Sequence, residues 1–173
     1  MTTTYNGWAA NLISETYIQK TVNWLAAAIH AADSSALVTN GAWTFKANAT
    51  VTGDTNAYSD ANLMAAGGKA GGTLDFYEVH YYADNGTANS PFTNMASHWG
   101  LDKPVVMGEF SALATDGVTA LNTYSTIFTN GYKGAWAWEY VFSSGDATGS
   151  AWPSMQAPMM QLYNADKSSL TCP

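Results

Sequence analysis

The chain has 173 residues, 47% of them hydrophobic, and this length favours a single domain, residues 1–173, with a sizeable core. Its formal net charge is -7 with only 6 Lys and Arg, so it offers no basic surface to nucleic acid and no polybasic segment to anionic lipid. The 7 Trp, 10 Tyr and 6 Phe, against 11% charged residues, suit a large core or stacking against flat apolar faces.

The first half of the chain is predicted to alternate between helices and strands. A helix over 14–32 is indicated by apolar residues that recur at three and four positions, namely Tyr17, Ile18, Val22, Leu25 and Ile29. A strand is expected over 36–40, a short helix over 59–66 before a Gly-Gly stop, and a second strand over 74–82. A further short helix is expected over 91–99, because Pro91 suits a first helical turn.

The second half continues the alternation, beginning with a third strand over 104–110. Asp116 or Thr115 is expected to cap a helix that ends at Gly131 and whose apolar stripe comprises Val118, Leu121, Tyr124, Ile127 and Phe128. A fourth strand is expected over 134–140, and a last helix over 153–163, in which Pro158 is a candidate kink. Strict alternation predicts an α/β fold with a parallel sheet and outer helices.

Glu109 ends a short run that is otherwise rich in apolar residues, 103–110 (KPVVMGEF). Such a run suits a strand buried on both faces, and a buried carboxylate is costly unless it is paired or used. The carboxylate can be a structural partner of Lys103 or Lys133, or it can take part in chemistry. The preceding strand carries Glu78, and we leave open whether that residue is a hydrogen-bonded core group or part of a site.

Four segments together resemble the C-terminal half, strands five to eight, of a cellulase-like retaining glycoside hydrolase of family 5, a clan A (β/α)8 barrel. They are 37–41 (LVTNG), 76–82 (FYEVHYY), 103–110 (KPVVMGEF) and 134–138 (GAWAW), in the family's order. The resemblance implies that Glu109 is the nucleophile, that His80 and Tyr82 hold the sugar or tune the nucleophile, and that Trp138 stacks beneath the sugar. Side-chain alternation places Glu78, His80 and Tyr82 on one side of their strand, toward a barrel interior.

The resemblance implies half of a TIM-type barrel, with four parallel strands and outer helices. Four parallel strands cannot close, and an open sheet leaves two edges and an apolar face uncovered. A second copy related by a two-fold axis would complete eight strands, so we predict a homodimer.

The family's acid is missing from the sequence. Retaining hydrolysis uses two carboxyl groups about 5 Å apart, and in the family the second comes from an Asn-Glu pair, which does not occur in this chain. Our hypothesis is that the partner's Glu139 takes this place opposite Glu109. Strand alternation argues against it, because an inward Trp138 directs Glu139 outward unless the strand has already ended.

Further aromatic residues are candidate sugar platforms, and no metal site is expected. Trp136 either fills the barrel or stacks on sugar, and Trp43, after the first strand, is open to the same two interpretations. His30 and His98 have no spaced partners, and the lone Cys172 cannot form an intrachain disulfide or a cysteine metal site. No export signal and no bilayer-spanning run is recognised, and the cellular location is not encoded.

The function that follows is a retaining endo-hydrolase of a β-1,4-linked polysaccharide, most simply cellulose or another β-glucan, without a cofactor. A β-mannanase is an alternative, because the sequence does not show which substrate hydroxyl is axial. The rival class is an inactive carbohydrate-binding half barrel, or a truncated fragment of an enzyme, that keeps the aromatic platforms without the acid.

Overall fold

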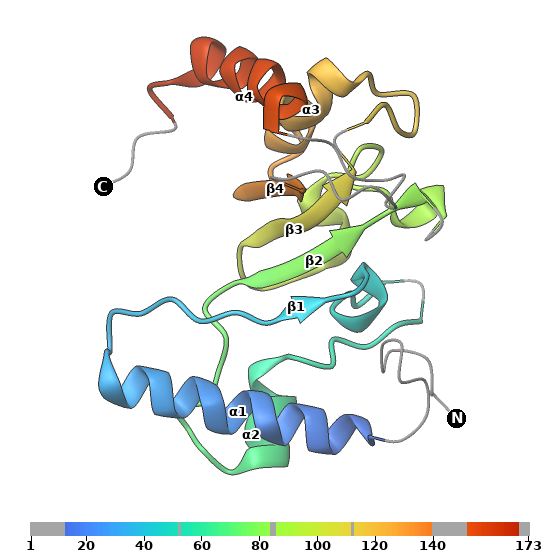
Figure 1. Ribbon diagram of the computed structural model, residues 1–173. Coiled ribbons are helices and arrows are strands. Elements are labelled where there is room, and N and C mark those ends of the chain that lie inside the picture. The colour runs from blue at the N-terminus through green and yellow to red at the C-terminus, as the bar shows by residue number, and fades with distance from the viewer. Residues whose placement is uncertain (1–12, 52, 84–85, 112, 140–151, 170–173) are drawn as a thin grey trace. The chain divides into compact units, whose positions relative to one another are not determined.

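The computed structural model describes residues 13–51, 53–83, 86–111, 113–139 and 152–169. It contains two compact units, one formed by Met1–Val79 with Ser97–Val105 and the other by His80–Ala96 with Val106–Pro173. The strands are β1 (Gly41–Ala42), β2 (Tyr77–Tyr81), β3 (Val105–Ser111) and β4 (Gly134–Trp138), in the order β1-β2-β3-β4. β1 pairs with β2 in parallel, and β3 pairs with β4 in parallel (Figure 1).

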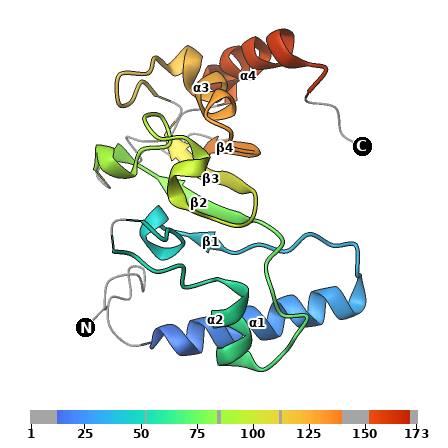
Figure 2. The same cartoon turned by 180° about the vertical axis from the view of Figure 1, so that it is seen from behind.

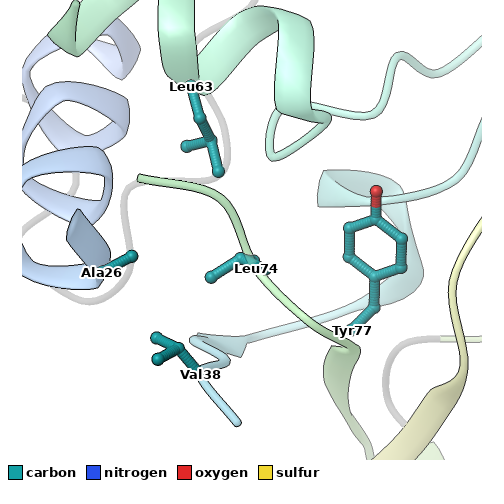
Figure 3. Close-up of a cluster of buried hydrophobic side chains, with 5 residues drawn as sticks. All are labelled: Ala26, Val38, Leu63, Leu74 and Tyr77. Carbon is teal, nitrogen blue, oxygen red and sulfur yellow. The ribbon is translucent and has the colours of Figure 1, made fainter. Parts of the chain in front are cut away.

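Two helices cover the first unit. α1 (Glu15–Ala32) and α2 (Asp60–Gly67) pack against each other, as both ribbon views show (Figures 1 and 2). Ser59 caps α2 by accepting a hydrogen bond from the Asn62 N–H, which satisfies one of the free donors of the first turn. Figure 3 shows the core beneath these helices, a cluster of Ala26, Val38, Leu63, Leu74 and Tyr77.

The face of α1 that is buried differs in part from the predicted one. Gln19, Asn23 and Ala26 are buried, and Val22 of the predicted stripe packs against the core cluster, whereas 68% of Tyr17 and 60% of Leu25 are exposed. The polar residues satisfy backbone groups that loops bring to the helix: Gln19 Nε2 donates to the Ala57 carbonyl, and Asn23 Nδ2 donates to the carbonyls of Lys69 and Gly72. The buried face of α1 therefore includes side chains that form hydrogen bonds, and a hydrophobic pattern does not predict such side chains.

Shorter elements complete the fold. The 3-10 helices are η2 (Phe45–Ala47), η4 (Thr87–Asn89), η5 (Ala96–Trp99) and η6 (Ala120–Asn122). In the second unit, α3 (Thr123–Thr129) packs against α4 (Trp152–Asp166), and both views place them side by side (Figures 1 and 2). In the first unit, the ring of Phe45 stacks on Trp99 with centroids 3.8 Å apart, which anchors the loop after β1.

Several predicted boundaries are corrected. The first strand is Gly41–Ala42, not 36–40, and the helix expected over 91–99 is a turn followed by η5. The helix after β3 begins at Thr123, and neither predicted cap stands before it: Asp116 lies in a turn with a positive φ of 48°, and Thr115 forms an isolated bridge with Val118. Pro158 lies inside α4, which continues through it to Asp166.

The fold class is confirmed as α/β, with four parallel strands and helices. The half-barrel arrangement, its closure by a second copy and the single-domain organisation stay predictions. Across the described ranges, no helix combines the length and apolar character that crossing a membrane requires.

Candidate active site

β2 alternates between buried and partly exposed side chains, as predicted. Tyr77, Val79 and Tyr81 are buried, and Glu78 and His80 between them are partly exposed. Tyr82, the next residue, is also partly exposed. The strand therefore directs its polar side chains away from the core.

A β-bulge determines the side of β3 from which Glu109 projects. Met107 pairs with Ala135 and Phe110 pairs with Ala137, so Gly108 and Glu109 together stand opposite a single residue, Trp136. Without the extra residue, alternation would place Glu109 on the face of Met107, which is fully buried. The bulge moves Glu109 to the opposite, more open face, and bulges beside active sites commonly re-aim a side chain in this way.

Tyr82 and His80 both approach the Glu109 carboxylate within the second unit. The Tyr82 hydroxyl donates a hydrogen bond to Glu109 Oε2 over 3.0 Å, and His80 Nδ1 lies 3.5 Å from the same oxygen. The side chains of His80 and Glu109 are 23% and 29% exposed, so the group is accessible yet partly shielded. The structure thus brings together three residues that the sequence predicted to act together, and both contacts are to Oε2 rather than to Oε1.

Trp138 projects from the same face of the β3–β4 pair as Glu109. It pairs with Ser111, which alternation places on the Glu109 side of β3, and 37% of its surface is exposed. Trp136 precedes it by two residues on that face and is 57% exposed. Both side chains are therefore exposed in the second unit.

The remaining predicted site residues are Glu78, Trp43 and Glu139. Glu78 and Trp43 belong to the first unit, where Glu78 pairs in register with Gly41 and Trp43 is 43% exposed. Glu139 follows β4 and is partly exposed, and the Trp138-Glu139 peptide bond is cis. Its role as the acid stays a prediction.

Lys103, one of the two predicted structural partners of Glu109, has other partners in the structure. Lys103 Nζ donates to Asp60 and to the carbonyl oxygen of Leu74, both in the first unit, and so it is engaged elsewhere. Lys133 is exposed, and its pairing with Glu109 is not supported by a contact. Tyr82 and His80 are the partners that the structure gives to the carboxylate.

Sequence reasoning missed the residues on the reverse side of this site. Tyr81, Phe92, Phe110 and Tyr124 form successive ring contacts, and the Tyr81 hydroxyl donates to Asp116 Oδ2 over 2.5 Å. The alternation that placed His80 and Tyr82 on one side could have indicated that Tyr81 lies on the other.

Within the described part of the chain, no group of three or more His, Cys, Asp or Glu side chains is placed to hold a metal ion. His30 instead contacts Asp75, with His30 Nε2 2.9 Å from Asp75 Oδ2. Cys172 lies outside the described residues.

The chain is similar to known mannanases. The mannan endo-1,4-beta-mannosidase of Mytilus edulis is 45% identical over 134 residues, which are 76% of this chain and 36% of that relative. The enzyme of the same name from Cryptopygus antarcticus is 34% identical over 166 residues, 94% of this chain and 43% of that relative. The crystal structure of beta-1,4-D-mannanase from Cryptopygus antarcticus matches with a TM-score of 0.82 and 35% identity over 90% of this chain and 43% of that one.

The similarity is limited to part of each relative. No protein-family model matches the chain. The chain spans less than half the length of the relatives that it matches, and so its fold corresponds to one part of theirs. The likeness covers most of this chain, and the relatives are named as a mannan endo-1,4-beta-mannosidase and a beta-1,4-D-mannanase.

Proposed function

We propose that this chain carries the nucleophile half of a retaining endo-β-1,4-mannanase, a glycoside hydrolase of the family 5 type. The observation that carries the proposal is the Tyr82–Glu109–His80 group at the end of the paired strands. The similarity to mannanases favours mannan, the alternative substrate, over the cellulose or β-glucan that the sequence patterns first suggested.

Glu109 attacks the anomeric carbon of the sugar and forms a glycosyl-enzyme ester. A C–O bond forms to a carboxylate oxygen, the glycosidic C–O bond breaks, and the leaving oxygen takes a proton from an acid. Because Tyr82 and His80 both contact Oε2, Oε1 is the oxygen that we assign to the attack. Water then hydrolyses the ester, so the product keeps the β configuration.

Tyr82, His80 and Trp138 prepare this step. The Tyr82 hydroxyl donates to the charged carboxylate and holds it in one orientation, since hydrogen bonds to ionised groups are the stronger ones. Trp138 offers an exposed aromatic surface on the same strand face, and sugar rings stack on such surfaces through their apolar C–H faces. Glu78 and Trp43 remain candidates for further sugar contacts.

The mechanism also requires a proton donor beside the nucleophile. The sequence holds four glutamates, and we keep Glu139 of a second copy as the proposed acid, which makes the active form a homodimer. The rival class, a half barrel that binds mannan without cleaving it, is favoured by the absence of an Asn-Glu pair from the sequence.

The deciding experiment is hydrolysis of β-1,4-mannan by the full chain and by Glu109→Gln. We expect release of new reducing ends from mannan in preference to carboxymethylcellulose, and loss of that activity by at least about 1,000-fold in Glu109→Gln. Glu15→Gln is the matched control, because Glu15 lies at the exposed start of α1. Binding of mannan without turnover would select the rival class, and activity that survives Glu109→Gln would remove Glu109 from the mechanism.

A further inference from the structure

A row of aromatic rings connects the reverse sides of the strands that carry the candidate site. We call Tyr81, Phe92, Phe110 and Tyr124 the aromatic row. Their successive ring centroids lie 6.1, 6.0 and 5.3 Å apart, and each pair meets edge to face, an attractive geometry for aromatic rings. Tyr81 precedes Tyr82 in the chain and Phe110 follows Glu109, so the row packs directly behind both site residues.

Tyr124 links the end of this row to β4. Its hydroxyl oxygen accepts a hydrogen bond from the backbone N–H of Ala137 over 3.3 Å, one residue before Trp138. The side chain of this α3 residue is buried, and so its ring and hydroxyl have a defined environment. One side chain therefore contacts the chain neighbour of Glu109 and the chain neighbour of Trp138.

The bulge in β3 explains why a contact between β3 and β4 matters at this position. A bulge interrupts the regular ladder and bends its strand, so the ladder alone defines the local spacing of the two strands less firmly. Phe110 and Ala137 are the first paired residues after the bulge, and Tyr124 contacts both of them. Tyr124 thus braces the two strands where the regular pairing resumes.

We propose that Tyr124 is a positioning residue, which sets the spacing between Glu109 and Trp138 by holding Phe110 through its ring and Ala137 through its hydroxyl. Its consequence for catalysis rests on the proposed mannanase function, whereas its effect on the site's geometry does not. At the opposite end of the row, Asp116 accepts a hydrogen bond from the Tyr81 hydroxyl.

Tyr124→Phe tests this role, because it keeps the ring and removes the hydrogen-bond acceptor. Tyr132→Phe is the matched control: Tyr132 is buried in the same unit, and its hydroxyl donates to the Asn94 carbonyl over 3.1 Å. In NMR spectra of the unliganded full chain, we expect Tyr124→Phe to shift the Trp138 indole N–H and the Glu109 carboxyl carbon resonances. Tyr132→Phe should leave both in place.

Catalysis provides the second measurement. We expect Tyr124→Phe to lower kcat/KM on mannan about tenfold, since displacement of a catalytic group by a fraction of an ångström has effects of this order, and Tyr132→Phe to change it less than about twofold. Equal effects of the two substitutions on the NMR resonances would overturn the positioning role. If the unsubstituted chain does not hydrolyse mannan, the proposed function fails, and the NMR comparison alone still decides whether Tyr124 positions the site.

Discussion

At the scale of single residues, the hydroxyl of Tyr82 is the group that orients the Glu109 carboxylate. Its hydrogen bond over 3.0 Å joins a neutral donor to a charged acceptor, and such bonds contribute about 1.5–3 kcal/mol. We expect Tyr82→Phe to lower kcat/KM on mannan about tenfold or more, because 1.4 kcal/mol corresponds to a factor of about ten. Steady-state kinetics check this, and Tyr163→Phe, on the exposed side of α4, should have no effect. Unchanged kinetics in Tyr82→Phe would show that the contact does not serve catalysis.

His30 makes the stability of the first unit depend on pH. Its Nδ1 lies 2.8 Å from the Gly71 carbonyl oxygen and its Nε2 2.9 Å from Asp75 Oδ2, and only a protonated ring can donate to both. The hydrogen bond to Gly71 and then that to Asp75 raise the pKa of His30 above its ordinary value. Burial opposes the charge of Asp75, but the Val38 N–H and His30 together lower the pKa of that carboxyl group.

The sign of the pH effect follows from this raised pKa. The stabilisation by His30 is fully present below the pKa of the unfolded chain, about 6.5, and is lost as the pH rises through the higher pKa of the folded chain. We therefore expect the thermal denaturation midpoint to fall as the pH rises above about 6.5, and His30→Gln to remove this component. His98→Gln, an exposed substitution, is the control. Parallel pH profiles for His30→Gln and the unsubstituted chain would contradict the assignment.

At the scale of elements, α1 is held to its unit by the hydrogen bonds of Asn23 as well as by apolar packing of Val22 and Ala26. Asn23 Nδ2 donates to the carbonyls of Lys69 and Gly72, and Oδ1 accepts from the Lys69 N–H. The packing there is close, since a Cβ atom added at Gly67 or Gly72 would collide with Asn23. Only glycine leaves room for this amide between the helix and the loop.

We expect Asn23→Ala to lower the free energy of unfolding by about 2 kcal/mol, because it removes the partner of the buried Gly72 carbonyl, and a buried group left without a partner costs about 1–3 kcal/mol. Urea denaturation measures this loss. Gln161→Ala, on α4, removes an exposed hydrogen bond to Asn122 of η6 and should change stability by less than about 0.5 kcal/mol. A loss in Asn23→Ala as small as this would mean that the loop relaxes around the missing amide.

At the scale of the whole molecule, the proposed acid requires a second copy of the chain. Large apolar side chains are exposed in each unit, among them Tyr17 and Leu25 in the first and Trp136 and Met160 in the second, and a second copy could cover part of such surface. We expect sedimentation equilibrium to give the mass of a dimer. A monomer at all concentrations that hydrolyses mannan would exclude the shared site.

Mixed subunits test the shared site directly. If Glu109 of one copy works with Glu139 of the other, Glu109→Gln and Glu139→Gln are each inactive, and a mixed dimer contains one intact site. After subunit exchange between equal amounts, about half of the dimers are mixed and each has one intact site of two. We therefore expect mixing to restore up to about a quarter of the unsubstituted activity, measured on mannan. If mixing restores no activity although the subunits have exchanged, the acid is a group other than Glu139 of the second copy.

The sequence by itself determined the order of elements and the composition of the site. Apolar periodicity located α1 and β3 closely, and period-two alternation placed His80 and Tyr82 on one side of β2, because both are local properties of the backbone. The resemblance to glycoside hydrolases identified Glu109 as their companion, which the contacts in the structure support.

Only the tertiary structure decided which faces those elements present. The bulge at Gly108 and Glu109 is defined by the pairing of β3 with β4. Asn23 donates hydrogen bonds to Lys69 and Gly72, which are 46 and 49 residues away in the chain. Tyr124 contacts β4 through Ala137. Each depends on contacts between distant parts of the chain, and hydrophobic patterns report burial along one element without showing what it meets. The side from which Glu109 projects is therefore a property of the folded pair of strands, not of its own segment.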